Sequence, residues 1–387
     1  GGRFVVVDPR RTRTAEAADE HHRIRPGTDV LWLLALIHVL FAEDLVELGR
    51  LEPHISGVDE VRAATATYTP EAVAEPTGVD ADTTRRIARE LAAAPAAAVY
   101  GRIGNHTVEY GTLASWAADV LNVLTGNLDR PGGVMFNSAP TIRIDSREPG
   151  GRGWQSGRWH GRVSGRPEVL GELPAASLAE EIETPGEGQI RALFLVASNP
   201  VRSFPNSERL DSALGQLDLL VAVDPYINAS TRHAHVILPP TSALERSHYD
   251  ITFERNMIRS FAKYSPPVFE VDRPGEPEIL CRLAQTIGGE PSADPSEVQE
   301  AMVRQAVERE VANATSPIDG RDPEEIIAEL SSWTWAEQLV DLRLRVGRFG
   351  DGFGADSDGL TLAKLRNDHP HGVDFGPLVE RFPAAIK

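Results

Sequence analysis

Short apolar runs, several of which end in a polar or proline-containing turn, recur along the first two thirds of the chain. Residues 3–7 read Arg-Phe-Val-Val-Val and stop at Asp8-Pro9-Arg10, the pattern of a buried strand followed by a loop. The run from Val30 to Ala42 follows a turn at Pro26-Gly27-Thr28-Asp29, whose last residues can cap a helix. Because this run is shorter than the ~20 residues that a membrane span needs, we predict a buried helix and no membrane span.

Helical spacing dominates residues 58–94, with Asp80 and Asp82 near one predicted helix start. The run Ala96–Tyr100 is predicted to be the next short buried strand, and a further helix is expected from about Leu113 to Leu124. Apolar strands that alternate with helices indicate a parallel sheet covered on both faces.

A second pattern of this kind follows a long stretch rich in Gly, Pro, Arg and Ser, which is predicted to be an irregular loop that is either functional or mobile. Short apolar runs at 192–196, 219–223 and 235–238 are predicted strands, and amphipathic helices are expected after Pro267. The predicted fold is therefore α/β, with two doubly wound (Rossmann-like) parallel-sheet lobes and a helical C-terminal extension. The expected boundaries are 1–136 for the first lobe, 137–188 for the loop, 189–266 for the second lobe and 267–387 for the extension.

The charge balance is acidic, with 57 acidic and 39 basic residues and a net charge of −18. This argues against a nucleic-acid-binding protein, whose footprint is a basic face. It does not argue against a small anionic ligand, because a few arginines and backbone N–H groups can hold phosphate locally.

Cys281 is the only cysteine, so these residues can form neither an intrachain disulfide nor a cysteine-ligated iron–sulfur cluster. Its place in an apolar helical stripe predicts a small buried filler rather than a reactive thiol. The chain opens with Gly1-Gly2-Arg3, without an initiator Met or a visible signal peptide. We therefore expect the true N-terminus to lie outside these residues, which leaves targeting open, and we expect a cytoplasmic location.

The residues that follow the predicted strands are the first to consider for chemistry, because ligands bind beyond the carboxyl ends of strands in an open α/β sheet. An acid at such an end can accept hydrogen bonds from ribose, an adjacent Arg can bind phosphate, and glycines let the backbone approach a flat ligand. Taken alone, Asp8-Pro9-Arg10 is better explained as a capped turn. The pair His233 and His235 invites a metal interpretation, but no third ligand stands at a characteristic distance, and packing is favoured.

Four sequence blocks, which occur in order along nearly the whole chain, shift the balance from structural turns to ligand binding. They are Val7 to Asp29, with Asp8-Pro9-Arg10 and Arg25-Pro26-Gly27-Thr28-Asp29; Leu124 to Gly133; Val223-Asp224-Pro225-Tyr226-Ile227-Asn228 followed by Ala234-His235-Val236-Ile237-Leu238-Pro239; and His371 to Leu378. Together they resemble the molybdopterin oxidoreductase family of the dimethyl-sulfoxide-reductase type, which includes formate dehydrogenases and nitrate reductases.

The resemblance implies two molybdopterin guanine dinucleotides, one per lobe, that hold a molybdenum or tungsten ion between them. It assigns the nucleotide end of one cofactor to Asp8, Arg10, Gly27 and Asp29, and the region near its pterin to Gly101, Arg102 and Gly104. It assigns the second cofactor to Asn199, Asp224, Asn228 and Ser230. Carboxylates suit the adjacent N–H donors of guanine, and short polar side chains suit phosphate or ribose.

The family's metal ligand and any iron–sulfur cluster belong to an N-terminal region, and its closing motif leads into a β-rich C-terminal domain; we expect both to lie outside these residues. The hypothesis is a metal-dependent oxidoreductase acting on a small substrate such as formate or nitrate, with an electron-transfer partner protein, in which this segment binds the cofactor and has little activity alone. His106 is the best candidate for lining a substrate funnel, although a surface position is favoured for it. The alternatives are an inert electron-transfer or scaffold subunit, related to the large iron–sulfur subunit of respiratory complex I, and a plain nucleotide-binding module.

Overall fold

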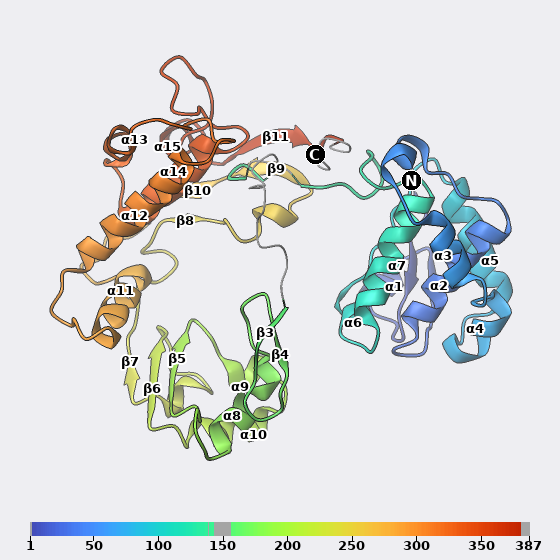
Figure 1. Cartoon of the computed structure of the whole chain (residues 1–387), viewed down its shortest axis with the longest axis horizontal. Coiled ribbons are helices and arrows are strands. Elements are labelled where there is room, and N and C mark those ends of the chain that lie inside the picture. The colour runs from blue at the N-terminus through green and yellow to red at the C-terminus, as the bar shows by residue number, and fades with distance from the viewer. Residues whose placement is uncertain (1, 138, 143–155, 381–387) are drawn as a thin grey trace. The chain divides into compact units, whose positions relative to one another are not determined.

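The computed structural model describes residues 2–137, 139–142 and 156–380. They form a mixed α/β structure with several small sheets and many helices (Figure 1). The chain divides into two compact units, one made of Gly1–Asn137 with Gly376–Lys387 and the other of Ser138–Phe375. The mixed α/β class is confirmed, and the doubly wound arrangement of each lobe stays a prediction.

The core of the first unit is built around α2 (Asp29–Ala42), in which Ala35, Ile37 and Leu40 are fully buried. A helix that is apolar on all sides must be covered on all sides, and here α3 (Val58–Thr65), α4 (Pro70–Thr77), α5 (Ala81–Ala93) and α7 (Gly111–Leu124) pack against it. The predicted buried helix is therefore confirmed. Within the described ranges, every helix falls short of the length and apolarity that a bilayer crossing requires.

The strand predicted at the start of the chain is confirmed as β1 (Val5–Val7), which pairs in parallel with β2 (Glu20–His22). The helices predicted over 58–94 and near 113–124 are also confirmed, and the Asp80 carboxylate caps α5 by accepting a hydrogen bond from the backbone N–H of Thr83. The other elements of this unit are α1 (Arg13–Ala17), the 3-10 helix η1 (Gly49–His54) and α6 (Ile103–His106).

The strand predicted at Ala96–Tyr100 is wrong, because these residues form no strand and Tyr100 is 74% exposed. Side chains take the place of a strand partner: the Asn122 amide accepts from the N–H of Val99 at 2.8 Å and donates to its carbonyl at 2.9 Å. Asn127 Oδ1 likewise accepts from the N–H of Ala97 at 3.0 Å. An apolar run satisfies its backbone in this way only when polar side chains from another segment reach it, and the local sequence does not reveal that.

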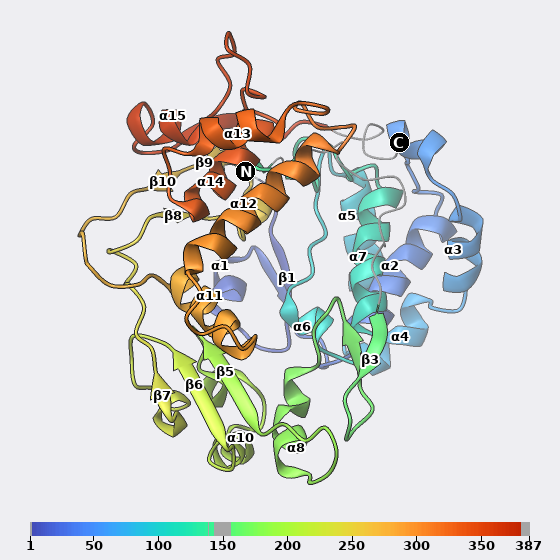
Figure 2. The ribbon, with the colours of Figure 1, turned by 60° about the vertical axis from the view of Figure 1, so that its left-hand side comes forward.

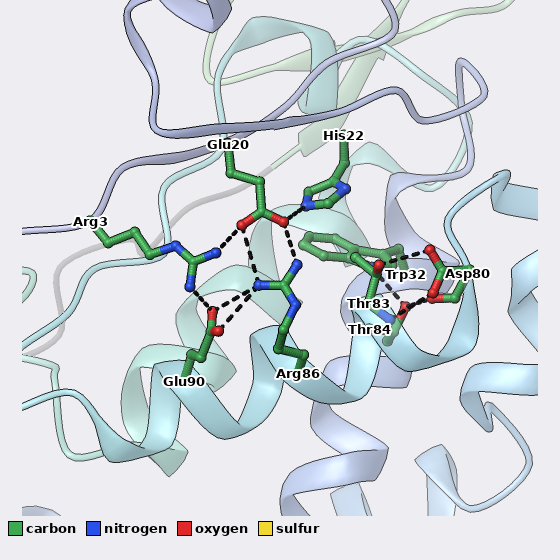
Figure 3. Close-up of polar contacts among 9 residues, drawn as sticks. All are labelled: Arg3, Glu20, His22, Trp32, Asp80, Thr83, Thr84, Arg86 and Glu90. Carbon is green, nitrogen blue, oxygen red and sulfur yellow. Dashed lines mark hydrogen bonds and ion pairs between the residues drawn. The ribbon is translucent and has the colours of Figure 1, made fainter.

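A polar network centred on Glu20 of β2 links this strand to α5 (Figure 3). Arg86 of α5 donates to Glu20 and, at 3.1 Å, to Glu90, while Arg3 pairs with both carboxylates. The guanidinium of Arg86, together with His22 and Arg3, lowers the pKa of Glu20 to about 2. The network joins β2 and the segment before β1 to α5.

In the second unit, the three predicted strands are confirmed as β5 (Ala192–Val196), β6 (Leu219–Val223) and β7 (Val236–Ile237). They form a parallel sheet in the order β5-β6-β7 (Figures 1 and 2). One face of the sheet packs against residues of α8 (Leu178–Glu183) and α10 (Ser207–Leu214), including Ile182, Leu210 and Leu214. Two short helical turns, α9 (Pro200–Ser203) and η3 (Thr231–His233), follow β5 and precede β7.

The segment 137–188, predicted to be irregular, contains regular structure in its described part. An antiparallel hairpin joins β3 (Ser156–His160) to β4 (Pro167–Val169), and η2 (Ala175–Ser177) leads into α8. Glycines at positive φ, Gly157 and Gly165, permit the irregular strand and its turn. The fully buried carboxylate of Glu168 pairs with Arg158 across the hairpin. These two glycines thus serve the hairpin, while residues 143–155 lie outside the described part.

The helices predicted after Pro267 are confirmed as α11 (Glu276–Ile287), α12 (Pro295–Val311), α13 (Pro323–Leu330), α14 (Trp335–Val346) and α15 (Leu362–Asn367). Cys281 of α11 is buried, as predicted. The small strands of this part are β8 (His248–Tyr249), β9 (Arg259–Ala262), β10 (Tyr264–Ser265) and β11 (Val373–Pro377), with the 3-10 helix η4 (Glu254–Asn256) between β8 and β9. β8 pairs with β10, and β9 pairs with β11.

Candidate functional site

The four residues assigned to the second lobe meet in one hydrogen-bonded cluster at the carboxyl ends of β5 and β6, which we call the strand-end cluster (Asn199, Asp224, Asn228 and Ser230). Ser230 is fully buried and donates its hydroxyl to Asn199 Oδ1 at 2.8 Å. The same hydroxyl accepts from the backbone N–H of Val201 at 2.9 Å. The loop after β5 is thereby bonded to the loop after β6, although 31 positions separate Asn199 from Ser230.

Asn228 connects the rest of the cluster. Its Oδ1 accepts from the backbone N–H groups of Ser230 and Thr231 at 2.9 and 3.0 Å, and its Nδ2 donates to Asp224 Oδ2 at 3.0 Å. The other oxygen of Asp224 accepts from the N–H of Tyr226 at 2.8 Å. Short polar side chains that bond their own loop backbone favour tight turns, so this sequence both forms the loop and places carboxylate and amide groups at the sheet edge.

Backbone strain accompanies the cluster at the end of β5. Ala197 has φ of 46°, a left-handed conformation that costs a residue with a Cβ about 1–2 kcal/mol. Its N–H still donates to the carbonyl of Val223 at 2.9 Å, so the strained residue stays bonded to β6. Strain of this kind persists where the surrounding structure imposes it, and it is common at ligand-binding sites.

In the first unit, the structure brings Asp8 and Asp29 close enough for their charges to interact. Asp8 follows β1, and its carboxylate accepts from the N–H of Arg10 at 2.7 Å. Asp29 is half-buried at the first position of α2. Burial raises the pKa of Asp29, and the negative charge of Asp8 raises it further. Two neighbouring carboxylates without a recorded cation among the described residues form a site that favours N–H donors or positive charge.

The remaining residues assigned to the nucleotide end, Arg10 and Gly27, lie in loops, Arg10 exposed and Gly27 half-buried. Gly27 has φ of 82°, and an added Cβ would meet nothing within 4 Å, so this turn needs glycine for its conformation and leaves open space above it. The Arg10 side chain is exposed, with no partner recorded among the described residues. Both fit a ligand that lies along the surface of the turn.

Gly101 and Gly104 differ in what surrounds them. A Cβ on Gly101 would lie 2.5 Å from Asn105 Nδ2 and 3.3 Å from His106 Nε2, whereas one on Gly104 would meet nothing within 4 Å. Gly101 therefore makes room for the side chain of Asn105, whose Oδ1 is buried and lacks a hydrogen-bond partner. A buried acceptor left unpaired is costly, and an N–H donor on a ligand would satisfy it. Arg102 is exposed just before α6.

Histidines contribute no metal site to the described ranges, which contain no group of three His, Cys, Asp or Glu residues able to hold an ion. His233 Nε2 contacts Asp211 Oδ1 at 2.6 Å, and His235 Nδ1 accepts from the N–H of Leu220 at 3.0 Å. Both histidines thus hydrogen-bond within the fold, and the packing interpretation of this pair stays a prediction. His106 is exposed at the end of α6.

Sequence reasoning missed two residues that complete these sites. Thr231, 1% exposed, accepts from the N–H of Asn228 at 2.7 Å and donates to the carbonyl of Tyr226 at 3.1 Å. Asn105 was missed as well. Its place after the second glycine of Gly101-Arg102-Ile103-Gly104 was the available signal, while its burial could be seen only in the folded chain.

Comparisons with known proteins agree with the resemblance. The family model described as molybdopterin oxidoreductase matches residues 2–276. The chain is 28% identical over 304 residues to the assimilatory nitrate reductase catalytic subunit of Bacillus subtilis, covering 74% of this chain and 42% of the relative. It is 26% identical over 310 residues to formate dehydrogenase H of Escherichia coli, covering 74% and 41%. The chain thus spans about two fifths of the length of these relatives.

A solved structure shares the fold. Acetylene hydratase from Pelobacter acetylenicus superposes with a TM-score of 0.60 at 21% identity, covering 76% of this chain and 45% of that one.

Proposed function

Because this chain belongs to the molybdopterin oxidoreductase family, we propose that it is the cofactor-binding part of a molybdenum or tungsten enzyme that acts on a small substrate such as formate or nitrate. When bound, the cofactor's metal would supply the redox chemistry, exchanging an oxygen atom, a hydride or electrons with the substrate. The described residues contribute binding and orientation. We further propose that each lobe is Rossmann-like and binds one molybdopterin guanine dinucleotide.

The observation that carries the proposal is the strand-end cluster. Asn199 and Asp224 follow adjacent parallel strands, at the edge of a sheet where α/β proteins bind ligands. Their mutual bonds through Ser230 and Asn228 hold the polar groups in fixed positions before a ligand arrives. Preorganised donors and acceptors lose little entropy on binding, and this favours a role in holding phosphate, ribose or guanine.

The first unit offers groups of matching chemistry for a second nucleotide. The carboxylates of Asp8 and Asp29 suit the adjacent N–H donors of guanine, and Arg10 suits a phosphate. The open turn at Gly27 permits close approach of a flat ring. We place the pterin near Gly101, Arg102 and Gly104.

The rival function, an inert electron-transfer or scaffold subunit, is not favoured. The relatives reported above are named as a nitrate reductase catalytic subunit and a formate dehydrogenase. An electron-transfer partner protein and a cytoplasmic location remain parts of the proposal.

The test is a cofactor analysis of the full-length protein, purified from a host that makes the cofactor. Molybdenum and tungsten are measured by mass spectrometry, and GMP released by acid hydrolysis is measured by chromatography. We expect metal and GMP in the wild type. The isosteric variant Asp29→Asn should lower the GMP content, whereas Asp59→Asn, at the exposed start of α3, should not. Absence of both metals and of GMP from the wild type would overturn the proposal.

A further inference from the structure

An apolar groove lies in the second unit between the turn after β4 and the helix α8. Its volume is about 750 Å³, and it is lined mainly by apolar side chains, which include Val169, Leu170, Leu173, Leu178, Ile190 and Phe204. Three of these on the rim are half-exposed, with 52% of Val169, 52% of Leu170 and 51% of Leu173 accessible. A molecule small enough to sit wholly inside the groove would leave these rim side chains in water, so an occupant larger than the groove fits better.

The turn that carries Leu170 is strained. Val169 and Glu172 exchange two backbone hydrogen bonds of 2.9 and 3.0 Å around Leu170 and Gly171, whose φ angles are 56° and 93°. Positive φ at both central residues is the geometry for which Asn-Gly is preferred. A leucine there has an unfavourable backbone and a half-exposed apolar side chain at once. Both features are unfavourable in the isolated chain. Both would be explained if another surface covered Leu170.

The charge around the groove indicates what kind of partner surface would bind there. Residues 167–190 contain six glutamates and no Lys or Arg. Arg158, Arg162 and Arg209 pair with three of them, Glu168, Glu181 and Glu183. Of the other three, Glu180 interacts electrostatically with Arg209, while for Glu172 and Glu187 the described residues include no recorded cationic partner. Glu172 lines the groove itself. An apolar groove with the unpaired carboxylate of Glu172 on its rim complements an apolar surface flanked by positive charge.

We propose that this groove is the docking site for an amphipathic helix of a partner protein, with an apolar face that covers Leu170 and Leu173 and with Lys or Arg residues opposite Glu172. Helices bind apolar grooves through side chains spaced i, i+3, i+4 and i+7. The site is separate from the strand-end cluster and needs no cofactor, so its test does not depend on the proposed function.

The experiment measures binding of a fluorescein-labelled helical peptide to the 387-residue chain by fluorescence anisotropy. The peptide has Leu at i, i+3, i+4 and i+7 and Lys on the other positions, and a control peptide has Glu in place of Lys. Leu170→Asn suits the turn geometry and removes the apolar contact, so it should preserve thermal stability and weaken binding about tenfold. Glu172→Lys should weaken binding by a similar factor.

Matched controls are Ile258→Asn, which removes an apolar side chain that is 87% exposed elsewhere in the unit, and Glu300→Lys, which makes the same charge change on α12. Both should bind the Lys peptide like the wild type. Failure of the wild type to bind it, equal binding of the Glu peptide, or equal binding by all four variants would overturn the proposal. A Leu170-dependent dimer in analytical ultracentrifugation would assign the groove to a second copy and would overturn it too.

Discussion

Ser230→Ala is the sharpest test of the strand-end cluster, because one buried hydroxyl makes both bonds that join the loop after β5 to the loop after β6. The substitution leaves the N–H of Val201 without its acceptor at a position that is 8% exposed. An unpaired buried donor costs about 1–3 kcal/mol. The loss at Asn199 is smaller because that side chain is only half-buried and can bind water. We expect a total destabilisation of about 2 kcal/mol.

Hydrogen exchange measured by mass spectrometry reports this change locally. A loss of about 2 kcal/mol corresponds to about thirtyfold faster exchange in peptides that cover α9 and η3, if they open together. Ser203→Ala is the matched control, because its exposed hydroxyl donates only to the carbonyl of Asn199 at 3.1 Å; its cost should be below about 0.5 kcal/mol. Equal exchange in the two variants would refute the role assigned to Ser230.

Three further predictions concern stability and reactivity. Ion pairs and hydrogen bonds lower the pKa of Glu20 to about 2, so the stability that its carboxylate contributes is complete above its ordinary pKa of 4.5 and is lost as the pH falls from there toward 2. Glu20→Gln should therefore flatten the pH dependence of thermal unfolding between these two values. An unchanged slope would contradict the role assigned to Glu20. Gly372→Ala should destabilise the chain more than Gly376→Ala in thermal unfolding, since both have positive φ but only the first would place a Cβ in collision with the Phe261 ring; equal melting temperatures would contradict this. Cys281 should react with a thiol reagent in the native chain far more slowly than in denaturant, because it is 7% exposed and burial raises the pKa of its thiol; fast native reaction would show that α11 opens readily.

The strand ends of the second unit were predictable because the relevant signals are local. β5, β6 and β7 are apolar runs ended by Asn199-Pro200, Asp224-Pro225 and Pro239-Pro240, and parallel strands place such ends at one edge. The prediction failed at Ala96–Tyr100, where the run is as apolar as the others. Its backbone is satisfied by Asn122 and Asn127, which lie on and just after a later helix. Periodicity within a run cannot reveal which distant side chains will reach it.

In the candidate site, too, some features were predictable from the sequence and others were not. The residue types and their order predicted Asp8, Asp29, Asn199 and Asp224 as nucleotide-binding residues, an assignment that stays a prediction. The interactions that fix the geometry join residues far apart in sequence, such as the hydrogen bond from Ser230 to Asn199 and the charge repulsion between Asp29 and Asp8. The unpaired oxygen of Asn105 depends on burial, which is a property of the packed chain.

By itself, the sequence determined the long helices, the strands β1, β5, β6 and β7, and the family, because hydrophobic spacing and ordered motifs are written in consecutive residues. Only the tertiary structure decided the hairpin of β3 and β4, the strained turn at Leu170, the apolar groove beside it and the joining of the strand-end cluster. Each of these depends on which surfaces meet when the chain folds, and the free energy of such contacts comes from burial and pairing between residues far apart in sequence.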